Sequence, residues 1–278
     1  MQKTVTEFST NATLTIGDES LLGKYVNPQQ AGLYTFIWSQ GKTLELIIDG
    51  LPTMVAPNSI VSLTPVQHLQ VLEAEDVIVY QFNREFYCIK DHDKQVGCAG
   101  ILFFGNNHIP IIELDEIEQI KFDQLHHVFL DEMETQDTIQ AEMLRMLLAR
   151  FIIKTTRLLK QSQPSENASE GTSETFRKYN ILVEAHFKEA HNVSFYADKL
   201  YKSPKTLSNS FKKLNKSPLR IIHDRLILET KRQLRYTEKT TKEIAYEIGF
   251  EDPSHLSRLF KKVTGLSPTQ FKGESTLV

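Results

Sequence analysis

The sequence predicts an α+β protein of two domains, in which a β-rich half is followed by an all-helical half. Short apolar stretches separated by turn residues fill residues 13–114, which is typical of a closed or sandwiched sheet. Apolar residues at helical spacing dominate the chain after residue 176. The 278 residues are enough for each half to have its own core.

The strands predicted in the first half are short and rich in β-branched and aromatic residues. They cover residues 34–38, 44–48, 59–63, 69–72, 77–82 and 101–104. Asp49 and Gly50 follow one of these alternating stretches, and this dipeptide favours the two-residue turn of a β-hairpin.

Two helices are predicted after the strands, over residues 115–133 and 137–160. The apolar stripe of the second helix is widened by methionine and isoleucine residues. It is therefore broader than packing against one small sheet requires. We therefore expect it to pack on its own domain and also on a second subunit, as a homodimer; a helix packed deeply within its own domain is the alternative. The predicted dimer contacts are Leu144, Leu147, Leu148 and Phe151.

Residues 161–175 have no apolar pattern and are rich in Ser, Glu and Gly, so they are predicted to form a flexible linker. The expected organisation is a first domain over residues 1–160, this linker, and a helical domain over residues 176–278.

The helical half contains the same pattern twice, and each copy ends in Phe-Lys-Lys followed by Ser-Pro. The first copy is Ala197, Leu200, Leu207, Phe211, Lys212, Lys213, Leu214, Ser217 and Pro218. The second copy is Ala245, Ile248, Leu256, Phe260, Lys261, Lys262, Val263, Ser267 and Pro268. In each copy a short helix, a tight break and a second helix follow one another, which predicts helix-turn-helix units at about residues 194–215 and 241–264.

Charge is divided unevenly between the halves. Residues 176–278 carry 20 Lys or Arg and 11 Asp or Glu, a net charge of +9, whereas residues 1–175 carry 12 and 24, a net charge of −12. A basic helical domain is expected if it neutralises DNA phosphates; a solvated surface imbalance is the alternative.

The outer faces of the second helices are predicted to contact double-stranded DNA, because the apolar faces are needed for packing. The candidate base-reading residues are Lys205, Ser208, Asn209, Ser254, His255 and Arg258. Arg258 can donate two hydrogen bonds to guanine, and Asn209 can pair with adenine in the same way. The candidate phosphate contacts are Lys212, Lys213, Lys261 and Lys262. A solvated helix face is the alternative for each of these residues.

A long helix between the copies, over residues 218–236, would hold the two second helices in fixed relation. If they enter successive major grooves on one face of B-DNA, they lie roughly 34 Å apart, so one chain reads two adjacent segments.

These residues resemble the AraC/XylS family of bacterial transcription regulators, most closely in TTKEIAYEIGFEDPSHLSRLFKKVTGLSP, residues 240–268. The resemblance covers residues 176–271 and implies two helix-turn-helix units joined by a long helix. It carries base-reading roles over to Lys205, Ser208, Asn209, Ser254 and Arg258. The first unit departs from the pattern in FKKLNKSP, which lacks the glycine that Gly265 supplies in the second.

The first half resembles the cupin-like sensor barrels of that family, which implies a ligand-sensing or dimerising domain. Its histidines lack the His-x-His spacing of metal-using cupins, so no metal, cofactor or catalysis is expected. Cys88 and Cys98 are interpreted as buried thiols, with a redox or metal pair as the alternative.

The predicted function is sequence-specific transcription regulation, with activation favoured by the family resemblance and RNA polymerase as a partner if the chain activates. The alternatives are a cupin-type enzyme joined to a DNA-binding module, and a barrel that serves only dimerisation or protein contacts. The sequence shows no apolar run long enough for a membrane span and no signal-peptide stretch, so a cytoplasmic protein without membrane contacts is expected.

Overall fold

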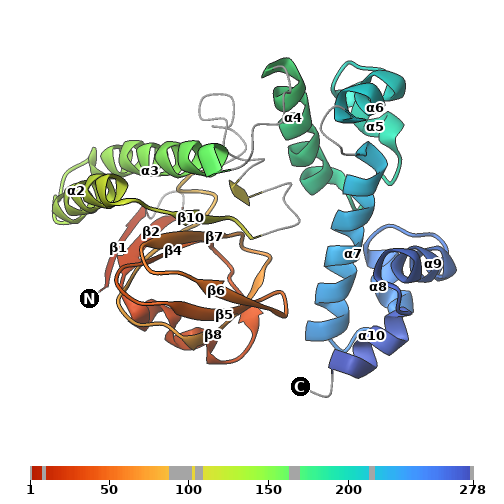
Figure 1. Ribbon diagram of the computed structural model, residues 1–278, viewed down its shortest axis with the longest axis horizontal. Coiled ribbons are helices and arrows are strands. Elements are labelled where there is room, and N and C mark those ends of the chain that lie inside the picture. The colour runs from red at the N-terminus through yellow and green to blue at the C-terminus, as the bar shows by residue number, and fades with distance from the viewer. Residues whose placement is uncertain are drawn as a thin grey trace. The chain divides into compact units, whose positions relative to one another are not determined.

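A computed structural model describes residues 2–7, 11–87, 102–103, 109–162, 170–212 and 217–275. It divides into two compact units, Met1–Pro164 and Ser165–Val278 (Figure 1). The predicted order of an antiparallel β domain with two trailing helices, followed by an all-helical domain, is confirmed. In the described part of the chain, no helix is long and apolar enough to cross a membrane.

The first unit consists of two antiparallel sheets and two helices. In spatial order, the larger sheet contains β1 (Lys3–Glu7), β2 (Ala12–Gly17), β9 (Val77–Phe82), β4 (Tyr34–Ser39), β7 (Ser59–Leu63) and β10 (Ile111–Glu113). The smaller sheet contains β3 (Gln29–Gln30), β8 (His68–Glu73), β5 (Leu44–Ile48) and β6 (Leu51–Val55). A 3-10 segment, η1 (Glu19–Val26), contacts β8 and β9. Of the predicted strand at residues 101–104, only residues 102–103 are described, and they do not form a strand.

The hairpin predicted from Asp49 and Gly50 is confirmed. Ile48 of β5 pairs with Leu51 of β6, which leaves a two-residue loop. Both loop residues have positive φ, 51° at Asp49 and 77° at Gly50, as the turn type of tight hairpins requires.

Strand β4 is buried on both of its faces because successive side chains point to opposite sides of the sheet. Ile37 joins the apolar cluster that contains residues of both sheets. Phe36 and Trp38 instead contact the two helices: their ring centroids lie 5.0 Å from Phe151 and 5.8 Å from Phe122, respectively. The core of this unit therefore has two layers, one between the sheets and one between the larger sheet and the helices.

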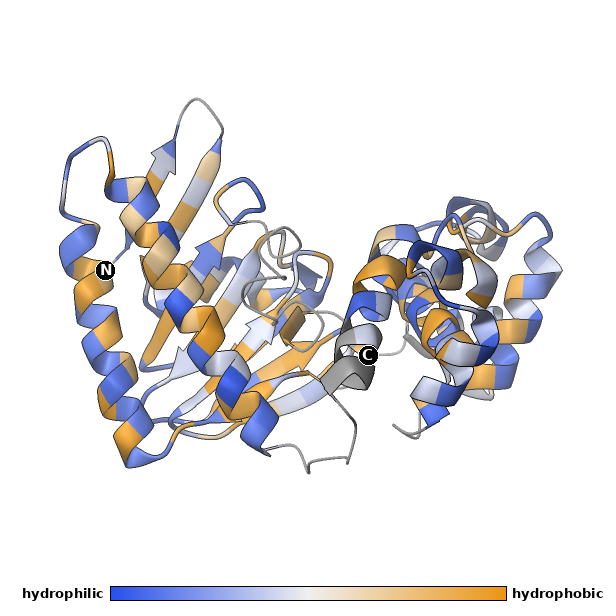
Figure 2. Cartoon of the chain, turned by 90° about the horizontal axis from the view of Figure 1, so that it is seen from above, coloured by the Kyte–Doolittle hydropathy of each residue, from blue (hydrophilic) through white to orange (hydrophobic). Residues whose placement is uncertain are grey.

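The two helices that cover the larger sheet are α2 (Glu116–Glu132) and α3 (Gln140–Ser162). Both alternate apolar and polar bands along their length (Figure 2). Helix α2 begins where the side chain of Asp115 accepts a hydrogen bond from the backbone N–H of Glu118, at 2.7 Å. The two helices predicted from apolar spacing are therefore present, with bounds close to those expected.

The predicted dimer contacts are wrong for three of the four residues. Leu144, Leu148 and Phe151 are fully buried in their own domain, so they have no surface to offer a second chain. Leu147 is half-buried. The stripe of α3 that faces outward instead carries Met143 and Met146, whose exposed fractions are 41% and 55%.

The packing of α2 on the sheet predicts a pH-dependent stability for the first unit. His126 of α2 is half-buried, and its Nδ1 shares a hydrogen bond of 2.7 Å with the hydroxyl of Tyr80. Burial, with a smaller contribution from the charge of His127, lowers the pKa of His126 from 6.5 to about 4. The unfolded chain therefore takes up this proton at a higher pH than the folded chain does. The resulting stability is present above pH 6.5 and is lost as the pH falls towards about 4.

We expect the urea midpoint of the full chain, followed by the fluorescence of Trp38, to fall across this pH window. Trp38 is the single tryptophan of the chain and lies in the first unit, so its emission reports that unit alone. His126→Gln should flatten the pH dependence, whereas His127→Gln, at an exposed position, should retain most of it. An unchanged slope in His126→Gln would contradict this assignment.

The second unit is entirely helical in its described residues. Its helices are α4 (Glu170–His186), α5 (Val193–Lys199), α6 (Pro204–Lys212), α7 (Pro218–Tyr236), α8 (Thr241–Glu247), α9 (Pro253–Thr264) and α10 (Pro268–Ser275). Helix α4 begins at Glu170, so the last residues of the predicted linker are helical. The predicted linker also overlaps the end of α3 at Ser162, and residues 163–169 lie outside the described part.

Candidate nucleic-acid interface

Two helix-turn-helix units have closely similar turns. In the first unit, α5 is followed by Tyr201 in the left-handed conformation (φ 53°), and the N–H of Lys202 bonds the carbonyl of Ala197 at 3.0 Å. In the second, Gly249 (φ 89°) follows α8, and the N–H of Phe250 bonds the carbonyl of Ala245 at 2.9 Å. Both first helices thus end in the same left-handed cap, which reverses the chain towards the second helix.

Side-chain caps fix the start of each second helix. Ser203 accepts a hydrogen bond from the N–H of Thr206 at 3.0 Å before α6, and Asp252 accepts one from the N–H of Ser254 at 2.8 Å before α9. Hydrogen bonds from Ser254 lower the pKa of Asp252. Since Pro occupies the first position of both helices, their starting points are well defined in the sequence.

Apolar residues attach each second helix to the domain core. Leu207 and Phe211 of α6, and Leu256 and Phe260 of α9, are fully buried. The ring of Phe211 lies 5.0 Å from that of Tyr179 in α4. The apolar positions that the repeat predicts to be packed are therefore buried, and the opposite faces of α6 and α9 are exposed to solvent.

The predicted base-reading and phosphate-contacting residues in the described part of the chain are all exposed. They are Lys205, Ser208, Asn209 and Lys212 on α6, and Ser254, His255, Arg258, Lys261 and Lys262 on α9. Lys213 lies outside the described residues. Two of these side chains have local partners. The hydroxyl of Ser254 donates to the carboxylate of Asp252, and His255 Nε2 lies 3.7 Å from the same carboxylate.

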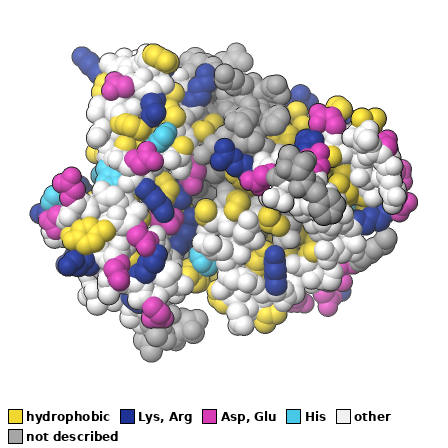
Figure 3. Space-filling model, turned by 180° about the vertical axis from the view of Figure 1, so that it is seen from behind, with side chains coloured by type: hydrophobic (Ala, Val, Ile, Leu, Met, Phe, Trp, Pro, Cys, Tyr) yellow, Lys and Arg dark blue, Asp and Glu magenta, His cyan; other side chains and the backbone are white. Residues whose placement is uncertain are grey.

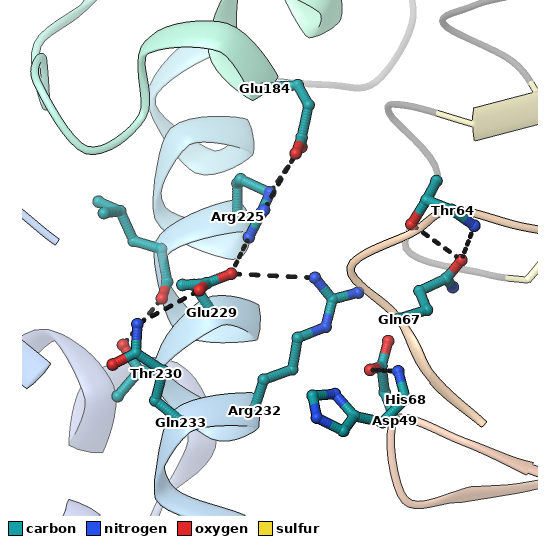
Figure 4. Close-up of polar contacts among 11 residues, drawn as sticks. Asp49, Thr64, Gln67, His68, Glu184, Arg225, Glu229, Thr230, Arg232 and Gln233 are labelled. Carbon is teal, nitrogen blue, oxygen red and sulfur yellow. Dashed lines mark hydrogen bonds and ion pairs between the residues drawn. The ribbon is translucent and has the colours of Figure 1, made fainter. Parts of the chain in front are cut away.

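Helix α7 joins the two helix-turn-helix units and is held to α4 by a partly buried ion-pair network (Figure 4). The guanidinium of Arg225 donates to both carboxylate oxygens of Glu184 in α4, at 2.6 and 3.0 Å, and to Glu229 at 3.1 Å. It also lies 3.9 Å from the ring centroid of Phe187. Burial alone would lower the pKa of Arg225, but the charges and hydrogen bonds of these two carboxylates raise it above its ordinary value.

A second contact joins the segment between α4 and α5 to the turn of the second helix-turn-helix unit. The Nε2 of His191 donates to the carbonyl of Ile248 at 2.9 Å, and its ring lies 4.5 Å from that of Phe250. A Cβ built on Gly249 would lie 1.9 Å from the carbonyl oxygen of Lys188. The second helix-turn-helix unit is therefore attached to the rest of the helical domain both by α7 and by this backbone approach.

Sequence reasoning did not find Tyr201, Arg225 or the Gly249 contact. The sequence did contain a signal for Tyr201: alignment of the two copies of the repeat places it opposite Gly249, at the turn of the helix-turn-helix unit. Arg225 and Glu184 are 41 residues apart, so their pairing depends on the packing of α7 against α4. On the helical unit as seen from behind, basic and acidic side chains are interspersed (Figure 3), so the positive excess of this half is not gathered on that face.

The described residues contain no group of three or more His, Cys, Asp or Glu side chains arranged to hold a metal ion. Cys88, Cys98, His92 and His108 lie outside the residues that the structure describes.

Two such units on one connecting helix, each with a polar outer face on its second helix, define a double helix-turn-helix domain. A family model described as a helix-turn-helix domain matches residues 196–274. The HTH-type transcriptional activator RhaS of Escherichia coli O1:K1 / APEC is 30% identical over 119 residues, which are 41% of this chain and 41% of RhaS. The match thus spans about two fifths of the length of that relative.

Among solved structures, ToxT from Vibrio cholerae O395 is 17% identical with a TM-score of 0.41, and the match covers 100% of this chain and 97% of that chain. The C-terminal domain of the response regulator yesN from Fusobacterium nucleatum is 27% identical with a TM-score of 0.33, covering 34% of this chain and 93% of its own. The helical domain of the present chain is therefore similar to the helix-turn-helix domains of such regulators, in agreement with the resemblance indicated by its sequence.

Proposed function

We propose that the chain is a sequence-specific DNA-binding transcription regulator whose two recognition helices, α6 and α9, read adjacent major-groove segments. The observation that carries this proposal is the division of each recognition helix into a buried apolar face and an exposed polar face. The excess of basic residues in the same half supports it, because phosphate contacts supply most of the sequence-independent affinity for DNA.

Arg258 is proposed as the principal base-reading residue, because its exposed guanidinium can donate two bonds to a guanine. Lys205, Ser208 and Asn209 take this role on α6. Ser254 is proposed to contribute mainly through its N-cap bond to Asp252, which fixes the start of α9. Lys212, Lys261 and Lys262 are proposed to contact phosphates, and so to set affinity rather than specificity.

Arg258→Ala is expected to relax the preference of the full chain at one base position, at a cost of about 1–3 kcal/mol in binding free energy. Lys262→Ala is the matched control, because it removes one exposed charge from the same helix and should weaken all duplexes alike. Binding to a set of single-base variants of a selected duplex separates the two outcomes. Equal loss on every duplex for Arg258→Ala would remove its proposed role.

The first unit is proposed to control the DNA-binding domain by binding a small-molecule effector or by forming a homodimer. Activation is favoured, since the similar protein RhaS is named as a transcriptional activator, and RNA polymerase would then be a further partner. A non-enzymatic role fits these relatives.

The dimer interface is now proposed on the exposed stripe of α3 around Met143 and Met146, rather than on the buried residues expected from the sequence. Met146→Asp should convert a dimer to a monomer, because it places an unpaired charge in the contact. Leu72→Asp is the matched control, at an exposed apolar position on β8 in the other sheet. Molar mass by light scattering decides between them, and a Met146→Asp dimer would rule out this interface.

A further inference from the structure

Tyr201 combines a solvent-exposed aromatic ring with a strained backbone. It lies in the turn between α5 and α6, its φ is 53°, and 97% of the residue is exposed. A side chain with this exposure contributes almost no packing to the fold. The left-handed conformation disfavours any residue with a Cβ, so the tyrosine is retained there against a conformational cost.

The second helix-turn-helix unit shows that a turn of this kind does not need a tyrosine side chain. Gly249 occupies the corresponding position, with φ 89° and the same pair of backbone bonds to the end of the preceding helix. At Gly249 a Cβ would meet the carbonyl oxygen of Lys188. Glycine would satisfy both turns, so the presence of tyrosine in the first one indicates a use outside the fold.

The surroundings of Tyr201 indicate what that use is. Lys199, Lys202 and Lys205 are all exposed within four residues of it, and Asp198 is the exposed acid in the same stretch. The turn directly precedes α6, so it lies beside the groove that this helix would enter. A phenol hydroxyl donates readily to phosphate oxygens, and such contacts fix the register of a recognition helix without reading sequence.

We propose that Tyr201 contacts the DNA backbone beside the first recognition helix, with its hydroxyl donating to a phosphate and the neighbouring lysines neutralising the same strand. This inference rests on the proposed function. The two helix-turn-helix units would then differ. The turn of the first would position α6 by contacting the DNA backbone, whereas the turn of the second is fixed within the protein by the approach of Gly249 to Lys188.

The test compares Tyr201→Gly and Tyr201→Phe in the full chain, using a duplex selected from random DNA by the wild type. Tyr201→Gly should leave the unfolding midpoint unchanged or raised, yet weaken binding about tenfold on every single-base variant of the duplex. Tyr201→Phe, which retains the ring but lacks the hydroxyl, should weaken binding to a similar extent, and wild-type affinity in this variant would contradict the hydroxyl contact. Tyr246→Phe, at an exposed tyrosine on α8, is the control and should bind as the wild type does.

Wild-type affinity in Tyr201→Gly would overturn the inference while leaving the proposed function intact. A loss confined to one base position would also overturn it, because the contact would then read sequence. If the wild type selects no DNA sequence, the proposed function itself is contradicted. This result comes from the selection step, before any variant is compared.

Discussion

Gly249→Ala is expected to destabilise the helical unit by at least about 3 kcal/mol, because two costs act at this position. A residue with a Cβ in the left-handed conformation costs about 1–2 kcal/mol. The added Cβ would also lie 1.9 Å from the carbonyl oxygen and 3.0 Å from the carbonyl carbon of Lys188, so backbone must move. Urea unfolding of the full chain, followed by circular dichroism, measures the loss, while Trp38 fluorescence should show the first unit unchanged.

Gly265→Ala is the matched control for this substitution. Gly265 follows α9 with φ 85°, but a Cβ there would meet nothing within 4 Å. It should therefore show the conformational cost alone, about 1–2 kcal/mol. If Gly249→Ala cost no more than Gly265→Ala, the close approach to Lys188 would not exist in solution.

Arg225→Ala is expected to cost about 3 kcal/mol, because it removes the partly buried guanidinium that pairs with Glu184 and leaves Glu229 with only its longer contacts to Arg232 and Gln233. Burial alone would raise the pKa of Glu229, yet the charge of Arg225 keeps it lowered, so this carboxylate is ionised and depends on the arginine. The substitution also removes the guanidinium that lies 3.9 Å from the ring of Phe187. The same unfolding measurement applies.

Arg220→Ala provides the comparison on the same helix. Arg220 pairs with Asp224 at 2.7 Å, but its side chain is 58% exposed, so the loss should be at most about 1 kcal/mol. Similar losses for Arg220→Ala and Arg225→Ala would show that the buried network does not hold α7 to α4.

Local sequence signals predicted much of the fold. The hairpin at Asp49 and Gly50 depends only on neighbouring residues, so the sequence alone predicts it. Strands β1, β2, β3 and β10 were not predicted, and β6 was implied only by the hairpin turn. Strand β1 is polar and only partly buried, and β10 is three residues long, so neither has the alternation that identifies a strand.

The error at the dimer interface has a different cause. Periodicity shows which residues of a helix share a face, but it does not show which face the rest of the chain already covers. Leu144, Leu148 and Phe151 are fully buried, and Phe151 contacts Phe36 and Tyr80 of the larger sheet, so the exposed methionines remain for other contacts. The exposed faces of α6 and α9 were easier to predict, because the repeat identified the buried positions twice.

Selection of bound duplexes from random DNA by the full chain, with the selected affinity then measured against salt, tests the central claim most directly. The account predicts an enriched sequence with two fixed segments about 10 base pairs apart, matching two recognition helices in successive major grooves. Binding to it should fall steeply as salt rises. A bound pool that remains random in sequence would contradict the account.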